Sequence, residues 1–99
     1  MQYTLSFTSE AEDTYDALSS QLMDRWGERF VLKFEGRVSK ALDTLSKTPF
    51  LYPVAIEEAQ IRKCIVHRNC SILYRVEGRI VTVICFWDNR QEPLFNLYT

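Results

Sequence analysis

The sequence predicts an α+β domain with the element order β-α-α-β-β-β, in which a helical hairpin packs on one face of a small, twisted and largely antiparallel sheet. Three observations lead to this fold. A short run near the N-terminus alternates polar and apolar residues, two longer runs repeat apolar residues at helical spacing, and three strand-like runs follow between residues 60 and 93. The 99 residues, 46% of them hydrophobic, are enough for one core, so we expect a single domain over residues 1–99.

The first element is expected to be a half-buried strand, because Tyr3, Leu5 and Phe7 alternate with polar residues. A helix is expected to follow it. Ser9 and Glu12 have the spacing of a capping box, in which each side chain bonds to a free backbone N–H of the first turn. The apolar face of this helix recurs every three or four residues: Ala11, Tyr15, Leu18, Leu22 and Trp26.

Gly27 is expected to end the first helix, and a second helix then begins. Its apolar stripe is Phe30, Phe34, Val38, Ala41 and Leu45. Gly36 lies in the middle of this helix, where glycine costs about 1 kcal/mol relative to alanine, so we expect that it allows the first helix to approach closely. Pro49 ends the helix because proline cannot continue the hydrogen-bond ladder. The two helices therefore form a hairpin whose shared apolar face needs a sheet to cover it.

Three antiparallel strands are expected in the second half, at residues 60–67, 71–76 and 79–87, with turns at residues 68–69 and 77–78. The first of these strands divides its side chains between two faces: Ile61, Lys63, Ile65 and His67 on one, Arg62, Cys64 and Val66 on the other. The last strand is the most apolar, so we expect it inside the sheet, covered on both faces. The sheet face opposite the helices is left available for binding.

Charge is distributed unevenly along a chain whose net charge is −1. Residues 1–59 carry six Lys and Arg against ten Asp and Glu, a balance of −4, whereas residues 60–99 carry six against three, a balance of +3. The basic half suits a phosphate or an acidic protein partner, although the same residues also suit solvated sheet edges and turns. Unspecific coating of nucleic acid is not expected, because the total charge is too low for strong binding through counterion release.

Composition excludes several other classes of protein. No apolar run approaches the length of a membrane span, and the N-terminus lacks the basic and apolar regions of a secretory signal. Three cysteines without CxxC spacing point to reduced thiols and a cytoplasmic location. No cofactor and no metal site is expected, because His67 and the cysteines lack the spacing of zinc ligands. Cys–His nucleophilic catalysis is disfavoured, since no acid is placed to orient His67.

Four features of the chain together resemble the RelE/ParE superfamily, the toxins of bacterial type II toxin–antitoxin systems. They are Arg62 in the sequence IRK, the sequence ILYRV at residues 72–76, a glycine-containing turn before an apolar strand, and the sequence DNRQEP that ends at Pro93. The resemblance covers essentially the whole chain. It implies the β-α-α-β-β-β fold, inhibition of bacterial growth, and neutralisation by a cognate antitoxin.

The RelE-like branch consists of ribosome-dependent endoribonucleases that cut mRNA. For such an activity the resemblance implies Arg62, Arg90 and Tyr98 as the catalytic residues, since a scissile phosphate needs cations around it. Cys64 stands where that branch has a second lysine, and Ser71 stands where it has a key arginine. A phosphate site without these two cations loses transition-state stabilisation, which argues against nuclease activity.

The ParE-like branch resembles the chain better, in the sequences LYRV and RQEP. Its members poison DNA gyrase through protein–protein contacts, and this inhibition needs no catalytic residues. We therefore favour a gyrase-binding toxin that is not an enzyme. Its target-binding residues are expected to be Arg62, Lys63, Arg75 and Arg90. Two alternatives stay open: the mRNA endoribonuclease, and an inactive relative that retains only antitoxin binding.

A cognate antitoxin is the partner that the resemblance implies, in a toxin–antitoxin hetero-oligomer. In this superfamily a C-terminal segment of the antitoxin wraps the helices and the sheet of the toxin. Such segments are often acidic, which suits the balance of +3 in residues 60–99. An amphipathic segment also needs aromatic anchors on the surface that it covers. We expect Phe50, Tyr52 and Trp87 to be these anchors.

Overall fold

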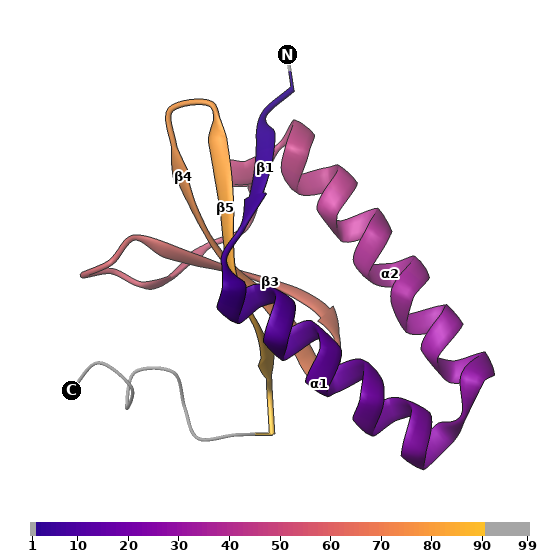
Figure 1. Cartoon of the computed structure of the whole chain (residues 1–99). Coiled ribbons are helices and arrows are strands. Elements are labelled where there is room, and N and C mark those ends of the chain that lie inside the picture. Colours follow the sequence, from indigo (N-terminus) through magenta and orange to yellow (C-terminus); the bar gives the residue numbers. More distant parts are fainter. Residues whose placement is uncertain (1, 91–99) are drawn as a thin grey trace.

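A helical hairpin and a five-stranded sheet make up the computed structural model, which describes residues 2–90 (Figure 1). The elements are, in order, β1 (Thr4–Phe7), α1 (Ser9–Trp26), α2 (Glu28–Lys47), the 3-10 turn η1 (Pro49–Leu51), β2 (Val54–Ile56), β3 (Ile61–His67), β4 (Cys70–Glu77) and β5 (Ile80–Asp88). The predicted α+β fold is confirmed, because both helices pack against the sheet. The short elements η1 and β2 lie in the connection that the sequence predicts between α2 and β3.

The sheet has the strand order β1-β5-β4-β3-β2, so the first and the last strand of residues 2–90 lie side by side. β1 runs parallel to β5, and all other neighbouring strands are antiparallel. β5 therefore has a strand on each side, as its apolar sequence predicts, and its Val81 and Val83 are fully buried. β1 pairs only with residues 80–83, in the first half of β5.

Helix α1 covers the edge of β5 that β1 leaves free. The Thr8 hydroxyl before the helix donates a hydrogen bond to the Ile84 carbonyl at 2.6 Å. One turn into the helix, the Thr14 Oγ1 accepts a hydrogen bond from the Phe86 N–H at 2.9 Å. Two threonine side chains thus satisfy backbone groups of β5 that have no neighbouring strand, which spares the sheet an open edge at this position.

The N-cap of α1 is Thr8, one residue before the predicted capping box of Ser9 and Glu12. Thr8 has extended backbone dihedrals, with φ −76° and ψ 162°, and its Oγ1 accepts a 3.0 Å hydrogen bond from the Ala11 N–H. The predicted position is wrong because Ser9 is already the first helical residue, whereas a capping residue has non-helical dihedrals.

Gly27 alone forms the turn of the helical hairpin. α1 stops at Trp26 and α2 starts at Glu28, and the φ of +85° at Gly27 lies in the region that favours glycine. Gly36 has a more open environment than the sequence predicts, since a Cβ built there meets no atom within 4 Å. The prediction that Gly36 allows a close approach of α1 is therefore wrong.

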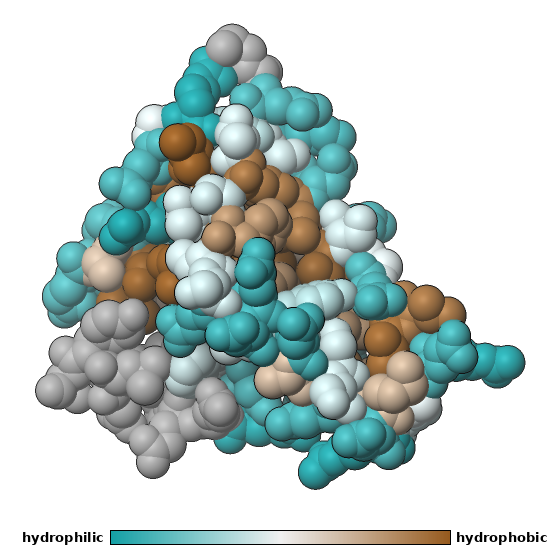
Figure 2. Space-filling view, viewed as in Figure 1, coloured by the Kyte–Doolittle hydropathy of each residue, from teal (hydrophilic) through white to brown (hydrophobic). Residues whose placement is uncertain are grey.

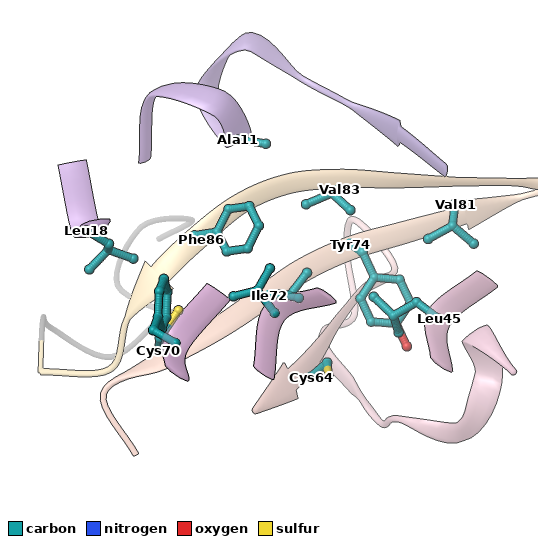
Figure 3. Close-up of a cluster of buried hydrophobic side chains, with 12 residues drawn as sticks. Ala11, Leu18, Leu45, Cys64, Cys70, Ile72, Tyr74, Val81, Val83 and Phe86 are labelled. Carbon is teal, nitrogen blue, oxygen red and sulfur yellow. The ribbon is translucent and has the colours of Figure 1, made fainter. Parts of the chain in front are cut away.

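The main core lies between the helices and the sheet (Figure 3). Five residues of the predicted helical stripes are buried in it: Ala11, Leu18, Phe34, Val38 and Leu45. Tyr74 of β4 is fully buried, and its hydroxyl donates a hydrogen bond to the Pro49 carbonyl at the end of the hairpin. Alternate residues of the strands form a smaller cluster on the opposite face of the sheet: Ile56, Ile61, Leu73 and Cys85.

Two aromatic residues of the predicted apolar faces are exposed instead. Trp26 is 63% exposed because the hairpin extends past the sheet (Figure 1), and there the Trp26 ring stacks on Phe30 with centroids 5.7 Å apart. Phe7 is 43% exposed because β1 is an edge strand that ends at this residue. Figure 2 shows further hydrophobic side chains at the surface between β1 and α2.

A β-bulge redirects the side chain at the end of β3. The register between β3 and β4 shifts between Ile65 and His67, which leaves Val66 without a partner. The His67 ring lies against α2, where it meets the Phe30 ring edge-on with centroids 5.8 Å apart. The predicted alternation, with His67 on the same face as Ile61 and Ile65, is wrong at His67 because the bulge adds one residue.

Candidate functional site

Arg62 lies in contact with two of the predicted antitoxin anchors. Its Nη1 donates a 2.6 Å hydrogen bond to the Tyr52 carbonyl, and its guanidinium carbon lies 5.0 Å from the centroid of the Phe50 ring. Phe50 belongs to η1 and Tyr52 follows it. The connection after α2 therefore brings an aromatic ring against a cation of β3, an arrangement that is attractive because the ring face is electron-rich.

This cluster continues toward the N-terminus and toward the start of β5. The Tyr3 and Phe50 rings meet edge-on with centroids 6.3 Å apart, and the Arg79 guanidinium lies 5.6 Å from the centroid of the Tyr3 ring. Two aromatic rings in contact therefore lie between two arginines on this surface. We call it the aromatic–arginine surface, and it consists of Tyr3, Phe50, Leu51, Tyr52, Arg62 and Arg79.

The aromatic–arginine surface has the composition of a protein-binding site. Phe50 is 58% exposed and Leu51 is 67% exposed, although both are large apolar residues. Aromatic and arginine side chains are enriched among the residues that dominate the binding energy of protein interfaces. The surface therefore offers apolar area and positive charge to the same partner.

Sequence reasoning missed Tyr3 and Arg79 as parts of this surface. The parallel pairing of β1 with β5 brings them together, because Thr4 lies opposite Ile80 and the residues that precede these two become neighbours. The signal in the sequence is an aromatic residue before one strand and a cation before another. It becomes informative only when the pairing of the two strands is known.

The structure does not bring together the residues that phosphodiester cleavage would require. Arg62 of β3 lies opposite Tyr74 of β4, whereas the last residue of β5 lies opposite Cys70, four residues away along β4. This separation corresponds to about 13 Å along the strand. Arg90 follows β5 and so lies at the far end of the sheet from Arg62. Tyr98, the third predicted catalytic residue, lies outside the described residues 2–90.

Arg90 is engaged in a two-pronged ion pair with Asp88. The Arg90 Nε donates to the Asp88 Oδ1 at 2.9 Å, and the Arg90 Nη2 donates to the Asp88 Oδ2 at 2.7 Å. The hydrogen bonds from the Arg90 side chain lower the pKa of the Asp88 carboxyl below its ordinary value, against the opposing effect of burial. The charge of Arg90 is thus compensated by a neighbour in its own chain.

The remaining predicted residues lie on the sheet face opposite the helices. Lys63 pairs with Leu73, which belongs to the smaller apolar cluster of that face. Arg75 follows two residues later in β4, and its Nη2 lies 3.3 Å from the Glu77 Oε1. Trp87 packs against the same cluster. The predicted target-binding and antitoxin-binding residues are therefore divided between two faces of the sheet.

Both residues that replace nuclease cations are buried. Cys64 is 1% exposed, and burial raises the pKa of its thiol. Ser71 is fully buried, and its hydroxyl donates a 2.9 Å hydrogen bond to the Asn89 Oδ1. Because the protein interior surrounds both side chains, neither position contributes to a phosphate site.

The other titratable groups are poorly suited to nucleophilic or metal chemistry. Burial raises the pKa of Cys70 to about 12 and that of Cys85 to about 11, so both thiols are protonated at neutral pH. Burial and two nearby cations, Arg37 and Arg68, lower the pKa of His67. Within residues 2–90, no group of three or more His, Cys, Asp and Glu side chains is arranged to hold a metal ion.

A protein-family model described as "ParE toxin of type II toxin-antitoxin system, parDE" matches residues 5–93. The chain belongs to the ParE toxin family. The resemblance to the RelE/ParE superfamily that the sequence indicates is thereby confirmed. A search of curated proteins gave no match. In the described part of this ParE-family chain, none of the helices is long and apolar enough to cross a membrane.

Several solved structures are similar to this chain. The chromosomal ParDE toxin–antitoxin system from P. aeruginosa matches with a TM-score of 0.74 and 18% identity, covering 87% of this chain and 95% of the other. A copper-bound mutant toxin from Helicobacter pylori matches with a TM-score of 0.63 and 15% identity, covering 89% of this chain and 96% of the other. The E. coli DinJ-YafQ toxin–antitoxin complex matches with a TM-score of 0.61 and 7% identity, covering 91% of this chain and 96% of the other. These identities show a shared fold alone.

Proposed function

We propose that this ParE-family toxin inhibits bacterial growth by binding a protein, DNA gyrase, through its aromatic–arginine surface. The observation that carries the proposal is the packing of Arg62 against Phe50 and Tyr52, which presents a cation and exposed apolar area together. Residues of these types supply much of the affinity of tight protein interfaces. Gyrase is the target that the resemblance to the ParE branch implies.

The arrangement of the cations favours this inhibitor over an endoribonuclease. Arg62 and Arg90 lie at opposite ends of the sheet, and Asp88 already pairs with Arg90. Cys64 and Ser71 are neutral and buried. Removing a single group that stabilises transition-state charge costs about 3–4 kcal/mol in known enzymes. A cleavage site that lacks several such groups would be slow, whereas protein binding needs none of them.

We also propose that a cognate antitoxin covers the same surface. Phe50 and Tyr52, the expected anchors of the antitoxin, are in direct contact with Arg62, an expected target-binding residue. An acidic, amphipathic segment that buries Phe50 would therefore also cover Arg62, so that antitoxin and target exclude each other. Lys63, Arg75 and Trp87 form a second contact area, which a segment that wraps around the sheet would reach.

The test measures gyrase poisoning by the purified chain and three of its variants, one of which is a control. The unaltered chain should accumulate covalent gyrase–DNA cleavage complexes. Arg62→Met and Arg79→Met should each require roughly tenfold more toxin for the same effect. Arg29→Met is the matched control, since Arg29 is exposed on α2 and lies outside the surface. Melting temperatures of all variants show whether they fold, which matters most for the hydrogen-bonded Arg62.

Other outcomes identify the alternatives. Equal poisoning by all three variants would reject the aromatic–arginine surface while keeping gyrase as the target. Cut mRNA in a translation extract, lost in Arg62→Met or in Arg90→Met, would identify an endoribonuclease. Antitoxin binding without growth inhibition on expression would identify an inactive relative.

A further inference from the structure

A cavity of about 310 Å³ lies at the hairpin end of the molecule, between the helix ends and the turn that joins β3 to β4. Its volume is near the lower limit of roughly 300–1,000 Å³ for small-molecule sites. The side chains that matter here are Arg25, Trp26, Phe30, His67, Arg68 and Arg90. Among the lining residues of the described part of the chain, none is acidic.

One wall of the cavity is aromatic. The Trp26 and Phe30 rings are stacked, with centroids 5.7 Å apart and planes 30° apart. His67 buttresses Phe30 from the β-bulge, edge-on at 5.8 Å. Trp26 is still 63% exposed after these contacts. A large exposed ring, fixed by a second ring, is a platform on which a planar aromatic group can stack.

Three arginines add positive charge to a lining that is otherwise apolar or neutral. Arg25 contributes from the end of α1, Arg68 from the turn after β3, and Arg90 from the end of β5. Asp88 compensates one of these three charges through its ion pair with Arg90. Burial is the largest cause of the lowered pKa of His67, and the charges of Arg37 and Arg68 add to it.

We propose that this cavity binds a nucleoside monophosphate, with the base stacked on Trp26 and the phosphate held by Arg25 and Arg68. Both parts of such a ligand have a matching wall, because every base has a π-face and arginine pairs with phosphate through two parallel hydrogen bonds. A single nucleotide suits the small volume. The site goes beyond the proposed function, since it lies at the far end of the sheet from Arg62.

The test is a titration of the full-length chain with adenosine monophosphate, followed by calorimetry and tryptophan fluorescence. The monophosphate should release heat and quench fluorescence, while adenosine alone and inorganic phosphate alone should bind at least about tenfold more weakly. Trp26→Leu and Arg68→Gln should each weaken binding at least about fivefold. Arg75→Gln is the matched control and should bind like the unaltered chain. Trp26, Arg68 and Arg75 are all exposed, so these variants should fold.

Three results would overturn the proposal. Absence of heat and quenching at millimolar monophosphate would exclude nucleotide binding in this cavity. Inorganic phosphate that binds as tightly as the monophosphate, with no effect of Trp26→Leu, would mean an adventitious ion only. An RNA tetranucleotide that binds at least about a hundredfold more tightly would mean that the cavity belongs to a binding groove for a polymer. A tetranucleotide with the affinity of the monophosphate and the same sensitivity to Trp26→Leu would support recognition of one nucleotide unit.

Discussion

The Oγ1 of Thr14 accepts a 2.9 Å hydrogen bond from the backbone N–H of Phe86, although 72 positions separate the two residues in the chain. This contact lies where β1 has ended and α1 takes over the edge of β5. A side chain of a helix thus replaces a partner strand at this position. The stability of the sheet edge should depend on that hydroxyl.

Replacing Thr14 by valine should destabilise the fold. The substitution leaves the Phe86 N–H without its acceptor, and an unsatisfied donor in a partly buried site costs about 1–3 kcal/mol. Urea denaturation measures the free energy of unfolding. The matched control is Thr44→Val, because within residues 2–90 the Thr44 hydroxyl bonds only to the Lys40 carbonyl of its own helix. Equal losses in both variants would contradict a special role of Thr14.

Tyr74→Phe should also destabilise the fold, by about 1–3 kcal/mol. Tyr74 is fully buried and its hydroxyl donates to the Pro49 carbonyl, so the variant leaves this carbonyl without its donor. The contact ties the middle of the sheet to the residue at which η1 begins. Amide hydrogen exchange should therefore speed up in η1 more than in α1. An equal increase of the exchange rate in η1 and α1 would contradict a specific link between Tyr74 and η1.

Stability should fall in alkaline solution because of the buried thiols. The ordinary thiol pKa is 9.0, and burial raises the pKa of Cys70 to about 12 in the folded chain. A raised pKa in the folded state means that the stabilisation is complete below pH 9 and is lost as the pH rises toward 12. Within this window, each such thiol lowers the free energy of unfolding by about 1.4 kcal/mol per pH unit as the pH rises. Urea denaturation between pH 8 and 11 should show a smaller slope for Cys70→Ala, and an unchanged slope would contradict the assignment.

The carboxyl of Asp88 should titrate below its ordinary pKa of 3.8 in the native chain. Hydrogen bonds from Arg90 cause this shift, so the pKa should rise in Arg90→Gln. A folded-state pKa that is depressed gives a stabilisation that is present above about pH 4 and is lost as the pH falls further. The side-chain carbonyl resonance of Asp88, followed by NMR, measures the pKa directly.

Phe50→Ala should weaken the binding of gyrase and of the antitoxin together. The proposed overlap of the two binding surfaces centres on this ring, whose loss removes the apolar neighbour of both Arg62 and Tyr3. We expect each dissociation constant to rise by roughly tenfold or more. Leu32→Ala is a closely matched control, since Leu32 is 59% exposed and Phe50 is 58% exposed. A loss of affinity for only one partner would show that the two surfaces are separate.

Most of the fold could be predicted from periodicity. The stripe of α2 marks Phe34, Val38 and Leu45, and all three are buried. The short strand β2 was not predicted, because its three residues after a proline are too few to show a recognisable alternation. The sheet face on which His67 lies was predicted wrongly for another reason. An added residue in a β-bulge inverts the alternation of side chains, and no pattern in the sequence marks it.

The candidate surface was only partly predictable. Arg62 could be found from the resemblance, and Phe50 and Tyr52 from their position between two prolines, but the sequence assigned them to different roles. Their direct contact depends on how η1 folds back beside β3. Tyr3 and Arg79 could not be found without the pairing of β1 with β5. No simple pattern in the sequence shows which strands are neighbours in the sheet.

That pairing of β1 with β5 also makes the two ends of the fold depend on each other during synthesis. Among the elements that the structure describes, β1 leaves the ribosome first, yet the strand that it joins is the last of them to emerge. The sheet therefore cannot close until β5 has been made, and contacts over such long sequence separations form slowly. A stop codon anywhere before β5 should accordingly yield a chain that never completes its sheet and is harmless to the cell that makes it.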